Sequence, residues 1–325
     1  MKRRMLILAV SVVLCVMCWH SGVLWTVLLR AGEWAALSTL SRSPLPGETV
    51  RLETGQGYEE GLLISPSGET ESKSSSTAPV VDLSMNNGKY TLTEGLAVKN
   101  GTSKEIDIAA LLEKGFEKPD LSGEGPVVLI YHTHGTESYA DAGAEYSKEW
   151  DKGVIGVGEE MKKEFEAAGL KTLHLTDNYI DTGPFKKAYT RSLAGVEAAL
   201  KKYPSIRIVL DIHRDSIAEG DTQYCPLTAI DGKEYAQIML ISGTDALGLA
   251  HPHWEKNFRF ALALSKKLQT DYSGLSRPIN LNPNRYNTHT TPYALLMEVG
   301  GSANTSAQAK RAGRAVAKSI AEIVS

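Results

Sequence analysis

The stretch PVVLIYHTHGTESY, residues 126–139, decides the fold that the sequence predicts. Its apolar run Val127–Ile130 is typical of a buried strand. The run continues almost directly into His132 and His134, and Glu137 follows three residues after the second histidine. A buried strand that ends in metal-binding side chains indicates a functional site at the edge of a sheet, where ligands of open α/β proteins gather.

Strand-like and helical segments alternate along the rest of the chain. The expected strands are Val127–His132, Lys171–Thr176, Ile206–His213, Ala236–Gly243 and Tyr293–Gly300, and the expected helices are Val154–Ala168, Lys186–Lys202, Trp254–Thr270 and Ser306–Val324. This alternation is typical of α/β proteins. We therefore predict an α/β fold with a mixed, mostly parallel central sheet and helices on both faces.

The N-terminus predicts a membrane anchor. Three basic residues at positions 2–4 precede the uncharged stretch Met5–Leu29. About 25 residues of helix can span about 30 Å of hydrocarbon. The basic flank belongs on the cytoplasmic side, so the rest of the chain is expected outside the cytoplasmic membrane. A cleaved signal peptide is the alternative.

These features predict three parts of the chain. Residues 1–35 form the transmembrane anchor, residues 36–120 a linker and small accessory segment, and residues 121–325 the catalytic domain. The segment Ser65–Pro79 is serine-rich and polar, as flexible tethers are.

Composition excludes several classes of protein. The net charge is −3 and no basic stripe occurs, so nucleic acid is not an expected partner. The three cysteines are Cys15, Cys18 and Cys225, and two of them lie in the N-terminal apolar run. This usage argues against a disulfide framework and against a cysteine-based zinc site.

Polar side chains cluster at the ends of three predicted strands. The first strand ends in His132 and His134, the third carries Asp211, His213 and Arg214, and the fifth carries Glu298. Parallel strands would bring these side chains to one edge of the sheet. Two or three histidines with a carboxylate are a common ligand set of catalytic zinc, and imidazole favours zinc over magnesium. We therefore predict a Zn²⁺ site at this edge.

The same pattern suggests individual roles. Gly135 indicates that the first strand has ended, so His134 at the mouth of the loop is the better ligand than His132. His213 is the second expected ligand. Glu298 is the candidate general base, at the end of a late apolar strand and followed by glycines. His132, Asp211 and Arg214 are expected to contact substrate or to orient the ligands.

Three motifs carry a resemblance to a known family. They are HTHGTESY (132–139), DIHRDS (211–216) and PNRYNTHTTPYALLMEVGG (283–301). In this order they resemble the stage II sporulation protein P family, membrane-anchored peptidoglycan hydrolases of endospore-forming bacteria. The resemblance covers the chain from Gly125 to the C-terminus, together with the N-terminal anchor. The catalytic domain of that family is similar to the zinc-dependent N-acetylmuramoyl-L-alanine amidases.

The resemblance implies a set of site residues. His134 and His213 match the two histidine ligands of the amidases, and Glu298 matches their catalytic base. The amidase spacing places a glutamate ligand near Glu149, and Glu145 is the alternative. The motif HTHGTE replaces the glycine-rich turn of the amidases, so the amidase geometry does not transfer to the residues around it.

The resemblance also implies a substrate and a setting. The expected substrate is peptidoglycan, cut at the amide between N-acetylmuramic acid and L-alanine, with endopeptidase activity on cross-links. The expected setting is engulfment of the forespore, in the space between the membranes, with the sporulation proteins D and M as partners. An inactive scaffold that binds peptidoglycan or partner proteins is one alternative, and a zinc peptidase acting on proteins is another. The absence of HExxH from the sequence disfavours the commonest form of that peptidase.

Overall fold

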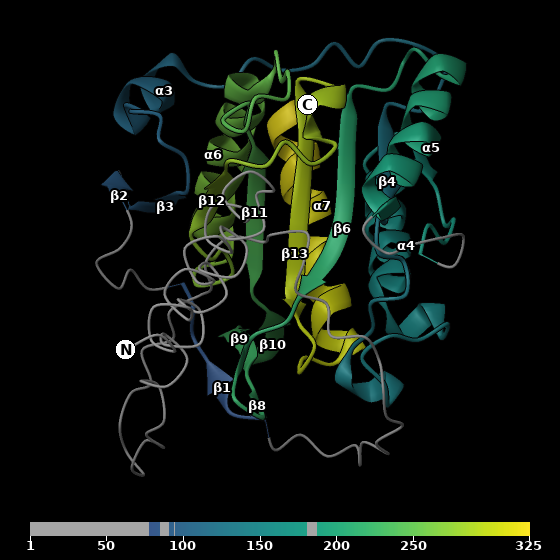
Figure 1. Ribbon diagram of the computed structural model, residues 1–325, viewed down its shortest axis with the longest axis vertical. Coiled ribbons are helices and arrows are strands. Elements are labelled where there is room, and N and C mark those ends of the chain that lie inside the picture. Colours follow the sequence, from purple (N-terminus) through teal and green to yellow (C-terminus); the bar gives the residue numbers. More distant parts are fainter. Residues whose placement is uncertain (1–77, 85–90, 94, 181–186) are drawn as a thin grey trace, which may run out of the picture. The chain divides into compact units, whose positions relative to one another are not determined.

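An eight-stranded sheet forms the core of the described part of the chain. The structure, a computed structural model, describes residues 78–84, 91–93, 95–180 and 187–325. The strand order is β2-β3-β12-β11-β13-β6-β4-β5 (Figure 1). The strands are β2 (Thr91–Thr93), β3 (Leu96–Asn100), β4 (Val128–Tyr131), β5 (Thr172–His174), β6 (Ile208–Asp215), β11 (Ile238–Gly243), β12 (Ile279–Asn282) and β13 (Tyr293–Gly301).

The sheet is mixed and mostly parallel, as predicted. Five of its seven strand pairs are parallel, and β2–β3 and β11–β13 are the antiparallel ones. Consequently β4, β5, β6 and β13 run in one direction, whereas β3, β11 and β12 run in the other. The carboxyl ends of β4, β6 and β13 therefore meet at one edge, which is the edge that carries the predicted site.

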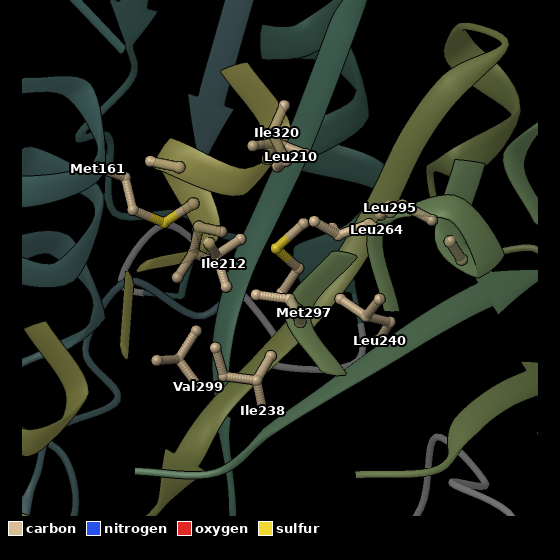
Figure 2. Close-up of a cluster of buried hydrophobic side chains, with 14 of the residues drawn as sticks. Met161, Leu210, Ile212, Ile238, Leu240, Leu264, Leu295, Met297, Val299 and Ile320 are labelled. Atoms are coloured by element: carbon tan, nitrogen blue, oxygen red, sulfur yellow. The ribbon is translucent and has the colours of Figure 1, made fainter. Parts of the chain in front are cut away.

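Three helices cover one face of the sheet. They are α4 (Val154–Ala167), α6 (Trp254–Asp271) and α7 (Ser306–Val324). Their apolar side chains form the main core with alternate residues of the strands, among them Leu210 and Ile212 of β6 and Met297 of β13 (Figure 2). Helix α7 begins with a capping box, in which the Thr305 hydroxyl accepts from the backbone of Gln308 and the Gln308 side chain accepts from the backbone of Thr305.

The opposite face is covered by α5 (Ala188–Lys202) over β4 and β6. Here Val196 and Ala199 of the helix pack against Leu129 and Val209. Side chains alternate between the faces of a strand. Because Ile212 faces the main core, its neighbours Asp211 and His213 face the α5 side, and this alternation orients the functional residues.

The sheet extends into the segment that we expected to be linker and accessory. Strand β3 pairs with β12, and the helix α3 (Ile108–Lys114) packs against α6. A smaller sheet of the described residues contains β1 (Val80–Val81), β9 (Cys225–Ile230) and β10 (Lys233–Ala236). Another contains β7 (Ala218–Glu219) and β8 (Thr222–Gln223). The described residues also include short 3-10 helices at η1 (Ala140–Ala142), η2 (Trp150–Lys152) and η4 (Thr288–Thr290).

The expected anchor, Met5–Leu29, and most of the expected tether lie outside the described residues. Within the described ranges, every helix is too short or too polar to cross a membrane.

Candidate metal centre

Two histidines and a glutamate meet at the carboxyl edge of β4 and β6. One ligand atom from each of His134, Glu137 and His213 lies within 4.8 Å of the others. The imidazole rings of the two histidines are 4.9 Å apart between centroids, at an angle of 83°. His134 comes from the turn after β4, and His213 from the end of β6. The predicted convergence of distant segments is therefore present in the structure.

Glu137 is held between the two histidines. One carboxylate oxygen, Oε1, lies 3.2 Å from His134 Nδ1, and the other, Oε2, lies 3.4 Å from His213 Nδ1. The backbone N–H of Glu137 donates to the carbonyl of His134 (3.1 Å), so a tight turn returns the glutamate to the histidine. The backbone N–H of Arg214 donates to Oε2 (3.0 Å). This carboxylate is therefore fixed by contacts from both strand ends.

The glutamates expected as the third ligand lie elsewhere. Glu145 has a side chain that is 42% exposed and pairs with Arg214 at 3.4 Å. Glu149 is 56% exposed and pairs with Lys152 at 2.8 Å. The group that the structure forms contains Glu137 instead of either residue. The physical reason is the separation along the sequence. Glu137 is three residues from His134 and reaches it through one tight turn, whereas Glu145 and Glu149 lie in the loop that follows.

The charges of the group are mutually dependent. Burial acts to raise the pKa of Glu137, but the neighbouring His213 and His134 outweigh it, so the pKa is lowered. Burial acts to lower the pKa of His213, but Asp211 and Glu137 raise it well above the ordinary value. The carboxylates of Glu137 and Asp211 therefore surround the imidazoles with negative charge. Such an environment also favours the binding of a cation.

Asp211 lies against His213 on the same strand. Its Oδ1 lies 3.0 Å from His213 Nε2 and accepts from the backbone N–H of Thr133 (2.9 Å). Its Oδ2 accepts from the Thr133 hydroxyl (2.7 Å). A carboxylate against a histidine ligand fixes the ring and raises its basicity. This position suits the expected role of Asp211 in orienting a ligand.

Glu298 lies beside the group on the neighbouring strand. It pairs in register with His213 in the parallel β6–β13 ladder, so both side chains are on the α5 side of the sheet. The residue is 6% exposed, and its Oε2 has no hydrogen-bond partner among the described residues. Burial and the nearby Asp215 raise the pKa of Glu298 to about 8. Gly300, with φ of +73°, lies in the irregularity of this ladder between Glu298 and Gly301.

Arg214 holds a loop rather than an open binding surface. Its guanidinium donates to the carbonyl oxygens of Ser138 (3.0 Å) and Glu145 (2.7 Å), and the residue is 4% exposed. It therefore attaches the loop of residues 138–153 to the end of β6. Arg214 also contacts the group through its main chain, because its backbone N–H donates to Glu137 Oε2.

His132 faces away from the group. Strand β4 ends at Tyr131, and the His132 side chain lies on the α4 side of the sheet. It is fully buried, and burial lowers its pKa to about 3. Its Nδ1 lies 3.0 Å from the carbonyl oxygen of Ile212, the residue before His213.

Sequence reasoning did not single out Tyr189. This residue at the start of α5 stacks parallel to His213, with ring centroids 6.3 Å apart at an angle of 9°. Its ring also meets that of His134 edge-on at 5.5 Å. No spacing in the sequence links Tyr189 to either histidine, because a helix and two strand ends bring them together. Glu137, by contrast, was visible as the carboxylate three residues after His134.

The donor set suits zinc. Two imidazoles and one carboxylate are a known ligand set of catalytic zinc and leave a fourth position for water. The three residues lie close enough to converge on one ion without a rearrangement of the strands. The unpartnered oxygen of Glu298 beside them gives the site an additional acceptor.

The fold and this group define an α/β protein with a candidate metal centre at the edge of a parallel block of strands. Residues 51–321 match Stage II sporulation protein P (SpoIIP), and the chain belongs to this family. This result confirms the resemblance that the three sequence motifs indicated.

Individual relatives are more distant. The chain is 29% identical over 217 residues to the stage II sporulation protein P of Bacillus subtilis (strain 168), a match that covers 62% of this chain and 52% of that protein. The chain thus matches about half the length of this curated relative. The CwlD amidase of Clostridioides difficile, solved in complex with the GerS lipoprotein, is 10% identical with a TM-score of 0.40, covering 60% of this chain and 97% of that chain. The catalytic domain of CwlV, an N-acetylmuramoyl-L-alanine amidase of Bacillus (Paenibacillus) polymyxa, is 16% identical with a TM-score of 0.35. This match covers 61% of this chain and 94% of that chain.

Proposed function

We propose that this chain is a zinc-dependent peptidoglycan hydrolase. The observation that carries the proposal is the group of His134, Glu137 and His213 with Glu298 beside it on the next strand. Membership of the Stage II sporulation protein P family supports peptidoglycan as the substrate. The bond cut is the amide between N-acetylmuramic acid and L-alanine, and peptide cross-links are a second target.

The residues divide the work. His134, Glu137 and His213 hold the zinc ion, which, when bound, lowers the pKa of a water molecule and polarises the scissile carbonyl. Glu298 takes a proton from the attacking water and delivers it to the leaving amine. The raised pKa of Glu298, about 8, suits a group that must both accept and release a proton near neutral pH. Asp211 keeps the His213 ring in one orientation.

The cellular setting completes the proposal. Residues 5–29 anchor the chain in the cell membrane, and the hydrolase faces the wall outside the cytoplasm, between the membranes during engulfment. The stage II sporulation proteins D and M act as its partners there.

The test is digestion of purified peptidoglycan by the full-length chain, purified in detergent, with zinc added or removed by a chelator. The fragments are identified by mass spectrometry. Stem peptides released with a free L-alanine amine, and only when zinc is present, support the proposal. Intact glycan and peptide under both conditions would contradict it and favour a scaffold that binds the wall. Cleavage of protein substrates with the wall left intact would favour a peptidase.

A further inference from the structure

A chain of polar contacts lies on the opposite face of the sheet from Glu137. His132 Nδ1 lies 3.0 Å from the carbonyl oxygen of Ile212, and His132 Nε2 lies 2.8 Å from His174 Nε2. His174 Nδ1 lies 3.2 Å from a carboxylate oxygen of Glu159 on α4. The His132 residue is fully buried and the His174 side chain is 3% exposed. None of these three side chains belongs to the proposed zinc ligands.

The His132 ring takes the place of a backbone donor at the end of the β4–β6 ladder. The two strands pair in register as far as Tyr131 and Asp211, but β6 continues to Asp215. The carbonyl of Ile212 lies just beyond the last β4 residue, where a backbone donor would otherwise bind it. The imidazole of His132 binds this carbonyl instead. It therefore holds the backbone immediately before His213.

The contacts dictate where the ring protons lie. A carbonyl oxygen only accepts, so His132 Nδ1 carries a proton and donates it to Ile212. In the neutral ring, Nε2 then accepts, and the group within reach is His174 Nε2, which must donate. The Glu159 carboxylate beside His174 Nδ1 only accepts, so His174 donates from both of its ring nitrogens. His174 therefore selects the tautomer in which His132 binds the strand. Without this donor, a fully buried Nε2 would lose its hydrogen bond.

Helix α4 closes the space around the two rings. A Cβ atom at Gly158 would lie 2.7 Å from His174 Nε2 and 2.8 Å from His132 Nε2. Glycine therefore lets the helix backbone pass directly over the contact between the rings. The glycine and the histidine pair form one packed unit beneath the end of β6.

We propose that His132 and His174 are positioning residues of the candidate metal centre: through the Ile212 carbonyl they hold the strand end that presents His213. The inference rests on the proposed function, because it concerns the alignment of a zinc ligand. Neither residue touches the ion or the substrate. Their loss misplaces His213, and it weakens zinc binding before it unfolds the protein.

The test compares two substitutions at one position in the full-length chain. His174→Gln keeps an N–H near the place of Nε2, whereas His174→Leu has a similar size and no donor. Zinc affinity is measured by competition with a chromophoric chelator. We expect the leucine variant to bind zinc 10- to 100-fold more weakly, the usual effect of removing a group that orients a ligand. The glutamine variant should remain near the wild type.

A second measurement does not depend on zinc. In the wild type with ¹⁵N-labelled histidine, long-range ¹H–¹⁵N spectra should show His132 with its proton on Nδ1. A proton on Nε2 of His132 would overturn the inference, whether or not the leucine variant folds. A folded leucine variant with unchanged zinc affinity would overturn it as well. If the wild type itself binds no zinc, the proposed function fails, and the ring protons still decide whether His132 holds the strand.

Discussion

Glu298 and His213 stand side by side across the parallel β6–β13 ladder, on the same face of the sheet. One belongs to the His134–Glu137–His213 group, and the other carries a buried oxygen with no partner among the described residues. The ladder register therefore places a buried acceptor next to the candidate metal centre, on the strand beside the one that carries His213. This distinction between ligand and base can be tested directly.

Replacing Glu298 should separate activity from metal binding. In Glu298→Gln the side chain keeps its size but accepts no proton, so we expect hydrolysis to fall by about 10²–10⁴-fold, the usual contribution of a general base. Zinc content, measured by atomic emission, should stay at the wild-type level. An empty site in this variant would make Glu298 a ligand and our assignment of roles wrong.

Three glutamate variants should identify the third ligand. Glu137→Gln should lose bound zinc and activity together, because its carboxylate lies between the two histidines. Glu145→Gln and Glu149→Gln serve as matched controls and should keep both, since each side chain is partly exposed and paired with a basic residue. Zinc loss in either control with zinc retained in Glu137→Gln would reverse the assignment.

Removing the Arg214 guanidinium should loosen the loop of residues 138–153. Arg214→Met leaves the carbonyls of Ser138 and Glu145 without their donor, and one unsatisfied buried group costs about 1–3 kcal/mol. We expect a lower free energy of unfolding by that amount and faster proteolysis within the loop. Lys201→Met, on the exposed end of α5, is the control and should change stability by less than about 0.5 kcal/mol. Equal protease resistance of the Arg214 variant and the wild type would contradict the role given to Arg214.

Alanine at Gly158 should strain the histidine pair. The added Cβ would lie less than 3 Å from both ring nitrogens, and overpacking of this kind costs about 1–3 kcal/mol. Chemical denaturation should show this loss, although alanine is the better helix former at an exposed position. Glu166→Ala, at an exposed position on the same helix, should leave stability nearly unchanged. Wild-type stability in Gly158→Ala would mean that the helix and the rings are not in close contact.

Acid should destabilise the fold through His251. Burial, with the nearby His289, lowers the pKa of His251 to about 4, and its Nε2 bonds the Thr288 hydroxyl at 3.0 Å. The unfolded chain takes up this proton near pH 6.5, but the folded chain does not, so stability falls as the pH drops from about 6.5 towards 4. Between pH 6.5 and 5.5 we expect this residue to cost about 1 kcal/mol. His251→Gln should reduce the slope of stability against pH in that window, and an unchanged slope would contradict the assignment.

The fold was largely predictable because its strands and helices are strongly patterned. The apolar runs that became β4, β6, β11 and β13 and the helices α4, α6 and α7 were all expected. Strand β12 was not, because Ile279–Asn282 is only four residues long, lies between two prolines and alternates isoleucine and leucine with asparagine. The reversal between β11 and β13 was also hidden, since apolar runs do not encode the direction of pairing.

The site was predictable only in part, for a related reason. His213 and Glu298 were singled out because they lie near the ends of apolar strands, and the structure places them in register on β6 and β13. Glu137 and Tyr189 depend on a turn and on the docking of a helix, which no periodic pattern describes. The contacts of His132 with Ile212 and His174 form because β4 ends before β6 does. The sequence pattern does not show where each strand ends.

The most direct test of the account is a crystal structure of the zinc-loaded chain with anomalous data collected on both sides of the zinc edge. We expect one strong anomalous peak at about 2.0–2.2 Å from ligand atoms of His134, Glu137 and His213, with Glu298 nearby but not bonded to the ion. A peak bonded to other side chains, or an empty group in protein that still hydrolyses peptidoglycan, would contradict it.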